Sequence, residues 1–154
     1  MSAPRLLLVD DEEAIRSSLA PYLQRSGYDV RTAGDGAEAL TIIDTWLPQS
    51  VVSDVLMPVL DGRGLVRALR ARDDWTPVIL LTQVGESYER SAALDEGADD
   101  YLNRPFDPAE LVARLRAVLR RAVPGRPPLA TADVLVAGGL RLERLARRVF
   151  VDGV

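Results

Sequence analysis

Short apolar runs and helically spaced apolar residues alternate along the first 121 positions of the chain. Runs typical of buried strands cover residues 5–9, 28–33, 50–54, 77–82 and 99–103. After each run, apolar side chains recur every three or four residues, which is the spacing of one helix face. This spacing predicts helices around residues 14–23, over 36–47, around 65–69, over 86–96 and over 107–121.

Five strand–helix repeats in succession indicate an α/β fold. The run Val78–Leu81 is apolar at every position, so both faces of that strand are expected to be covered. Parallel strands covered on both faces are typical of a doubly wound sheet. We therefore predict a doubly wound α/β domain over residues 1–122. Asp107, Pro108 and Glu110 form a typical start for its last helix, with a capping aspartate, a first-turn proline and a first-turn acid.

The pattern changes after residue 122. Residues 123–131 contain Pro124, Gly125, Pro127 and Pro128, a composition typical of a semi-rigid linker. Apolar residues then alternate with period two around 134–136, 140–142 and 149–151, which predicts short antiparallel strands. Three such strands bury too little surface to form a stable domain alone. We therefore interpret residues 132–154 as the beginning of a second domain.

Composition and charge narrow the possible chemistry. The chain has no cysteine and no histidine, which excludes thiolate and imidazole side chains as nucleophiles, bases or metal ligands. All 19 basic residues are arginine. Residues 1–122 carry 14 arginines and 20 acids, a net charge of −6 that argues against direct binding of nucleic acid; residues 123–154 carry a net charge of +2. With no long apolar run and no signal-peptide pattern, we expect a cytoplasmic protein that does not enter a membrane.

Acidic side chains mark the ends of two predicted strands. Asp10 and Asp11 follow the first strand, Asp54 ends the third, and Thr82 ends the fourth. Function in an open parallel sheet is concentrated at the carboxyl ends of the strands, so these residues are expected to meet at one edge. One such acid could simply cap a helix. Three carboxylates together favour a shared cation, and Mg²⁺ suits oxygen ligands best.

These residues belong to four motifs that resemble those of a response-regulator receiver domain. The motifs are Asp10–Asp11, the run from Asp54 to Gly62, Thr82, and the run from Gly97 to Phe106. The resemblance covers residues 5–121 and implies a flavodoxin-like five-stranded parallel sheet of order 2-1-3-4-5.

The same resemblance assigns roles at the strand ends. It implies that Asp54 accepts a phosphoryl group, and that Asp10, Asp11, Asp54 and the main-chain carbonyl of Leu56 bind magnesium. Thr82 would hydrogen-bond the phosphoryl group, and Tyr101 would turn inward when Thr82 moves. A domain of this kind catalyses only its own phosphorylation and dephosphorylation, so we do not expect a metabolic enzyme.

Arg104 departs from the family pattern, in which lysine stands before the proline–phenylalanine pair. The family lysine contacts the acceptor and then the phosphoryl group. Arginine keeps the charge but is longer and planar, and it binds pairs of oxygens. We therefore expect Arg104 to act in catalysis with a different geometry.

The chain also resembles the OmpR/PhoB subfamily, whose receivers dimerise through the fourth helix, fifth strand and fifth helix. The residues that would form pairs at this interface are Arg90 with Glu110, Asp100 with Arg114, and Asp99 with Arg121. The resemblance implies a sensor histidine kinase as phosphoryl donor. It also implies that the strands from residue 132 begin a winged-helix effector. DNA would then be bound only through the remainder of that effector domain.

Two other functions are compatible with part of this pattern. A magnesium-dependent phosphatase or phosphotransferase could use the same acids on an external substrate, although Leu56 provides no acid for a leaving group two residues after Asp54. A flavodoxin-like cofactor binder is the other alternative. Against it, acids follow the first strand where a glycine-rich phosphate loop would be needed. Phosphorylation by a small donor in the presence of magnesium discriminates among the three.

Overall fold

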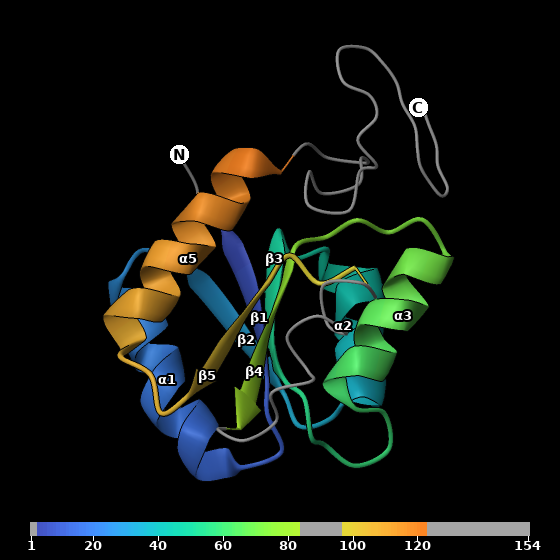
Figure 1. The fold of residues 1–154 in the computed structure, drawn as a ribbon, viewed down its shortest axis with the longest axis horizontal. Helices are drawn as coiled ribbons and strands as arrows, with labels where there is room; N and C mark the ends of the chain where they lie inside the picture. The colour runs from blue at the N-terminus through green and yellow to red at the C-terminus, as the bar shows by residue number, and fades with distance from the viewer. Residues whose placement is uncertain (1–2, 84–96, 123–154) are drawn as a thin grey trace.

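Five parallel strands form the central sheet of the computed structural model, which describes residues 3–83 and 97–122. The strands are β1 (Arg5–Val9), β2 (Asp29–Ala33), β3 (Ser50–Asp54), β4 (Val78–Gln83) and β5 (Asp100–Arg104). They lie in the order β2-β1-β3-β4-β5 (Figure 1). The predicted fold class and strand order are confirmed, and each predicted strand differs from the observed one by at most one residue at either end.

Helices cover both faces of the sheet. α1 (Glu13–Arg25) and α5 (Pro108–Arg121) lie on one side, and α2 (Gly36–Trp46) and α3 (Gly62–Ala71) lie on the other (Figure 1). The predicted helix over 86–96, the linker and the later strands lie outside the described residues. Within the described ranges, no helix is both long and apolar enough to cross a lipid bilayer.

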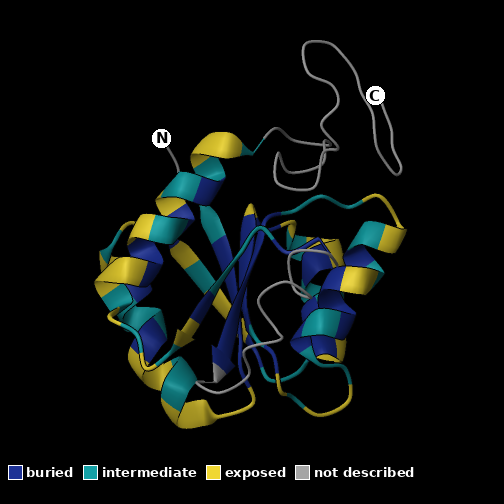
Figure 2. Cartoon of the chain, viewed as in Figure 1, coloured by how far each residue is buried: buried dark blue, intermediate teal, exposed yellow. Residues whose placement is uncertain are grey.

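The alternation of side chains along the strands produces two separate cores. In β1, Leu6 and Leu8 pack on the side of α1 and α5, whereas Leu7 and Val9 pack on the side of α2 and α3. All four side chains are fully buried. Figure 2 shows the central strands as the most deeply buried part of the domain. Burial on both faces explains why these strands are continuously apolar rather than alternating.

Helix ends follow local sequence signals. Asp107 caps α5 by accepting a hydrogen bond from the Ala109 amide, with Pro108 in the first turn, so the predicted start of this helix is confirmed. The predicted helix over 36–47 ends one residue early, because Leu47 adopts a left-handed conformation with φ of 55°. The guanidinium of Arg5 donates two hydrogen bonds to the Leu47 carbonyl oxygen and stabilises this turn.

Gly62 allows α3 to begin directly behind the end of β3. A Cβ atom at this position would lie 2.3 Å from the main-chain oxygen of Asp54. No side chain fits there without moving the backbone of the strand that carries the central acid. The Gly62 amide also donates to the Val55 carbonyl at 2.9 Å, which fixes the loop between β3 and α3.

Candidate functional site

Three carboxylates meet at the carboxyl edge of the sheet. Asp10 and Asp11 follow β1, and Asp54 ends the neighbouring strand β3. One oxygen from each carboxylate lies within 4.8 Å of the other two. Asp10 is buried, Asp54 is partly buried and Asp11 is exposed. The cluster predicted from the sequence is thus brought together, with one side open to solvent.

Hydrogen bonds hold the Asp10 carboxylate in place. Its Oδ1 accepts the Glu12 amide at 2.9 Å, and its Oδ2 accepts the Arg104 guanidinium at 2.7 Å. The guanidinium of Arg16 donates to the main-chain oxygen of the same residue. Asp10 is therefore oriented by one arginine six residues away and by another that is 94 residues away.

Asp54 has an unusual affinity for protons. Burial and, to a smaller extent, the negative charges of Asp10 and Asp11 raise the pKa of its carboxyl to about 6. The Arg104 guanidinium, with its Nη2 3.6 Å from Oδ1, and the Val55 amide both act to lower this pKa. Asp54 is therefore mainly ionised at neutral pH, although it is protonated more readily than an exposed aspartate.

The donor set fits a hard cation. Carboxylate oxygens are the preferred protein ligands of Mg²⁺, which also retains several waters, and the exposed side of the cluster leaves room for them. Leu56, the predicted source of a carbonyl ligand, lies two residues after Asp54, and its side chain is largely exposed. That the main-chain carbonyl of Leu56 binds magnesium stays a prediction.

Thr82 and Asn103 pair at the ends of β4 and β5. The two residues are direct neighbours in the sheet register, and the Thr82 hydroxyl donates to Oδ1 of Asn103. Thr82 is buried and lies one residue beyond Leu81, the sheet neighbour of Asp54. Asn103 was not among the predicted site residues. The pattern could have indicated it, because Asn103 is a polar residue at the carboxyl end of a predicted strand, as Thr82 is.

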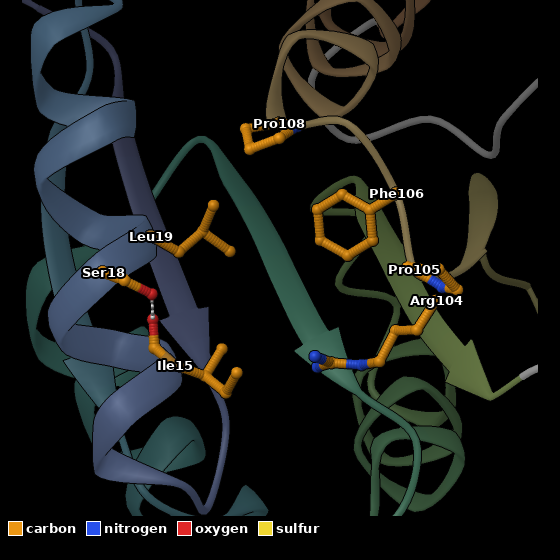
Figure 3. A pocket seen from close by; sticks show the side chains of 7 residues that line it. All are labelled: Ile15, Ser18, Leu19, Arg104, Pro105, Phe106 and Pro108. Carbon is orange, nitrogen blue, oxygen red and sulfur yellow. Dashed lines mark hydrogen bonds between the residues drawn. The ribbon is translucent and has the colours of Figure 1, made fainter.

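Arg104 connects the acids to an open groove of about 570 Å³. The groove lies between α1 and the segment joining β5 to α5, and its lining residues are Ile15, Ser18, Leu19, Arg104, Pro105, Phe106 and Pro108. Figure 3 shows the α1 side chains facing Phe106 across this space, with Arg104 extending along its floor. The groove is mainly apolar and ends at the residue that contacts Asp10 and Asp54.

Several residues of the charge pairs predicted for a dimer interface contact residues of the same chain. Arg114 donates to both carboxylate oxygens of Asp100 at 3.0 Å and to Glu110 at 3.2 Å. Asp99 pairs with Arg70, and each of these two side chains is only 8% exposed. Arg121 influences the pKa of Asp99 from within the same chain. Arg90 lies outside the described residues.

Tyr101, the predicted switch aromatic, occupies the middle of β5. Its side chain is partly buried and packs against the core on the side of α2 and α3. Its amide donates to the Asp100 carboxylate at 2.8 Å. Along β5, Tyr101 thus lies between Asn103 at the strand end and Asp100, which pairs with Arg114 of α5.

Comparison with known proteins identifies this arrangement. The model of the response regulator receiver domain family matches residues 6–116, which include all the strand-end residues described above. The chain belongs to this family. Its receiver domain is similar to those of transcriptional regulators. This similarity is consistent with the OmpR/PhoB subfamily, as the sequence resemblance implied.

Two groups of relatives illustrate the similarity. Transcriptional regulatory protein PrrA of Mycobacterium leprae is 44% identical over 154 residues, which make up 100% of this chain and 65% of PrrA. Response regulator MprA of Mycobacterium sp. (strain KMS) is 46% identical over 145 residues, or 94% of this chain and 62% of MprA. The chain therefore spans slightly less than two thirds of the length of these relatives.

Solved structures share the receiver fold. A response regulator from Chloroflexus aurantiacus superposes with a TM-score of 0.73 at 37% identity, covering 79% of this chain and 100% of that one. The receiver domain of NtrX from Brucella abortus has a TM-score of 0.72 at 29% identity, covering 76% and 99%. The parallel sheet of order β2-β1-β3-β4-β5 is the architecture of a receiver domain.

Proposed function

We propose that this receiver accepts a phosphoryl group on Asp54 from a phosphohistidine of a sensor kinase, and that the phosphorylated form dimerises to control a transcription regulator. The observation that carries the proposal is the position of Asp54. It ends β3 with Asp10 and Asp11 within 4.8 Å and Arg104 alongside. The named transcriptional relatives supply the link to gene regulation.

The transfer requires an ionised Asp54. One of its carboxylate oxygens forms a bond to phosphorus while the bond from phosphorus to the kinase imidazole breaks, and the imidazole nitrogen keeps the electron pair. At neutral pH, a pKa of about 6 leaves most of Asp54 ready to attack. Arg104 and Thr82 are placed to stabilise phosphoryl oxygens by hydrogen bonds.

Asp10, Asp11, Asp54 and the Leu56 carbonyl would hold Mg²⁺. When bound, this ion supplies neutralisation of the charge on the phosphoryl oxygens. The direction of attack would be set by the protein, because Asp54 ends β3 and its Oδ1 accepts the Val55 amide and lies beside Arg104. A phosphatase acting on an external substrate is disfavoured, because the position two residues after Asp54 is Leu56 and cannot protonate a leaving group.

We place the kinase in the groove between α1 and the segment joining β5 to α5. Its apolar lining by Ile15, Leu19 and Phe106 suits a helical segment of a protein partner rather than a charged small molecule. Arg104 lines this groove and also contacts Asp54. A histidine on a helix seated there would therefore lie next to the acceptor.

Downstream signalling would pass through β5 and α5. Thr82 moving toward a phosphoryl group gives up its hydrogen bond to Asn103, and Tyr101, two residues before Asn103 on the same strand, would change position in response. The charged surface formed by Asp100, Glu110 and Arg114 is the proposed site of dimerisation. Dimerisation would bring together two effector domains, which bind DNA outside the receiver.

The proposal is tested by incubating the chain with phosphoramidate and magnesium and measuring intact mass. The parent is expected to gain one phosphoryl group, and Asp54→Asn none. Asp44→Asn is the matched control, because Asp44 is an exposed aspartate on α2 that pairs with Arg72 away from the site. A phosphoryl group on Asp54→Asn, or none on the parent, would exclude Asp54 as the acceptor.

A further inference from the structure

Arg104 makes its shortest contact with Asp10 and not with the proposed phosphoryl acceptor. We propose that Arg104 is a counter-ion of the resting receiver that competes with magnesium for Asp10, so that metal binding releases this guanidinium toward the phosphoryl group. This inference rests on the proposed function and concerns the regulation of the same site. It is specific to a chain that carries arginine where the family pattern has lysine.

Distances identify which acid Arg104 occupies. Its Nη2 lies 2.7 Å from Oδ2 of Asp10 and 3.6 Å from Oδ1 of Asp54. The first is a charge-assisted hydrogen bond of ordinary length, whereas the second is only an ion-pair contact. Arg104 therefore neutralises a buried metal-ligand candidate more directly than it does the acceptor.

The Asp10 carboxylate has both of its oxygens in use. Oδ1 accepts the Glu12 amide and Oδ2 accepts Arg104, and the residue is only 1% exposed. A divalent ion that binds Oδ2 takes the oxygen that the guanidinium occupies, and two cations sharing one carboxylate repel each other at short range. Binding of the ion is therefore opposed by the Arg104–Asp10 pair.

The rest of the guanidinium is prepared for a different ligand. Among the described residues, Nε of Arg104 is buried and has no hydrogen-bond partner. An unpaired buried donor is unfavourable, and a guanidinium can present Nε and one terminal nitrogen side by side to two oxygens. A phosphoryl group on Asp54 offers such a pair of oxygens. Phosphorylation would thus satisfy the donor that the resting state leaves without a partner.

The competition predicts a gain in metal affinity when the Asp10 contact is removed. Titration calorimetry with Mg²⁺ is carried out on the parent, Arg104→Lys and Arg104→Met. Both variants are expected to bind Mg²⁺ about tenfold more tightly, which is the effect of losing one charge-assisted hydrogen bond. Lysine keeps the positive charge but lacks the length and the planar fork. Arg104→Lys therefore tests the loss of the hydrogen bond to Asp10 without a loss of positive charge.

Arg16→Met is the matched control. It removes an equal charge beside Asp10, but Arg16 contacts the main-chain oxygen and not the carboxylate. This control is expected to change the Mg²⁺ affinity by less than about twofold. Independently, the side-chain Nε–H resonance of Arg104, assigned by its absence in Arg104→Lys, is expected to shift when the parent is saturated with Mg²⁺.

Three outcomes would overturn the competition. These are equal affinities in the parent and both Arg104 variants, equal tightening by Arg16→Met, or an Nε–H resonance that does not respond to the ion. The first and third can occur while Asp54 is still phosphorylated, and the proposed function then stands without the competition. If no variant binds Mg²⁺, both the competition and the proposed metal site are wrong.

Discussion

Arg70 and Asp99 form a salt bridge of 3.0 Å in which each side chain is only 8% exposed. The other donors of the same guanidinium bind the main-chain oxygens of Gly97, Asp74 and Thr76. All five N–H groups of the guanidinium are therefore used. Arg70 ties the end of α3 to the segment before β4 and to the segment entering β5. The Asp99 carboxylate is thus bound by Arg70 within the domain.

Removal of the Arg70 guanidinium is expected to destabilise the domain strongly. Arg70→Met should lower the free energy of unfolding by about 3–5 kcal/mol, because it leaves the buried Asp99 carboxylate with the Val78 amide but without its cationic partner. Urea denaturation measures this change. Arg72→Met is the control, since the ion pairs of Arg72 with Asp44 and Asp74 are more exposed and should contribute less than about 1 kcal/mol. Similar losses in the two variants would contradict the importance of the buried pair.

The pH dependence of the Arg70→Met defect follows from Asp99. Burial raises the pKa of Asp99 from 3.8 to about 6, while Arg70 acts to lower it. A raised folded-state pKa gives a stability contribution that is fully present below 3.8 and is lost as the pH rises through about 6. Without Arg70 this loss should be larger. The Arg70→Met deficit should therefore be greater at about pH 8 than at about pH 5. Adding Asp99→Asn should remove most of this difference.

Magnesium binding is expected to compete with a proton on Asp54. Its pKa of about 6 in the metal-free protein means that the carboxylate is mostly ionised at neutral pH and mostly protonated near pH 5. The apparent Mg²⁺ affinity should therefore fall about tenfold between about pH 7.5 and about pH 5. Calorimetry in two buffers of different ionisation heat should detect proton release at the lower pH. A pH-independent affinity would show that Asp54 is not a metal ligand.

A bulky side chain in the groove should slow phosphoryl transfer from the kinase without slowing phosphorylation of Asp54 by a small donor. Ser18→Arg places a long charged side chain in the groove next to Ile15 and Leu19. It should slow phosphorylation by a sensor kinase about tenfold or more, while phosphorylation by phosphoramidate is unchanged. Ser17→Arg is the control, because Ser17 is exposed on the same helix but does not line the groove. Equal effects of the two substitutions on the kinase reaction would contradict docking in the groove.

Mixing two variants can determine whether Asp100 and Arg114 pair across a dimer. Because they pair within the chain in this structure, reversing both in one protomer restores the pair whether it lies within or between subunits. Mixing Asp100→Arg protomers with Arg114→Glu protomers restores it only across an interface. With beryllofluoride and magnesium, each variant alone should dimerise weakly, and the mixture should form heterodimers. Sedimentation velocity measures both. A mixture no better than its components would show that the pair stays within one chain.

The sequence predicted the sheet and the acid cluster well because both depend on local patterns. The apolar run before Asp10 and the one ending at Asp54 identify two strands, and parallel strands necessarily bring such ends to one edge. Thr82 was found in the same way. Asn103 carried the same signal and was overlooked as a site residue, although its carboxamide accepts the Thr82 hydrogen bond.

The sequence by itself therefore determined the order of the elements, the two-sided burial of the strands and the identity of the residues at the strand ends. Only the tertiary structure decided which acid each arginine binds. Arg104 pairs with Asp10, 94 residues away, and Arg70 pairs with Asp99, 29 residues away. A guanidinium on a long side chain can reach several acids, and periodicity carries no information about that choice. It depends on distances and desolvation that exist only once the sheet has brought distant segments together.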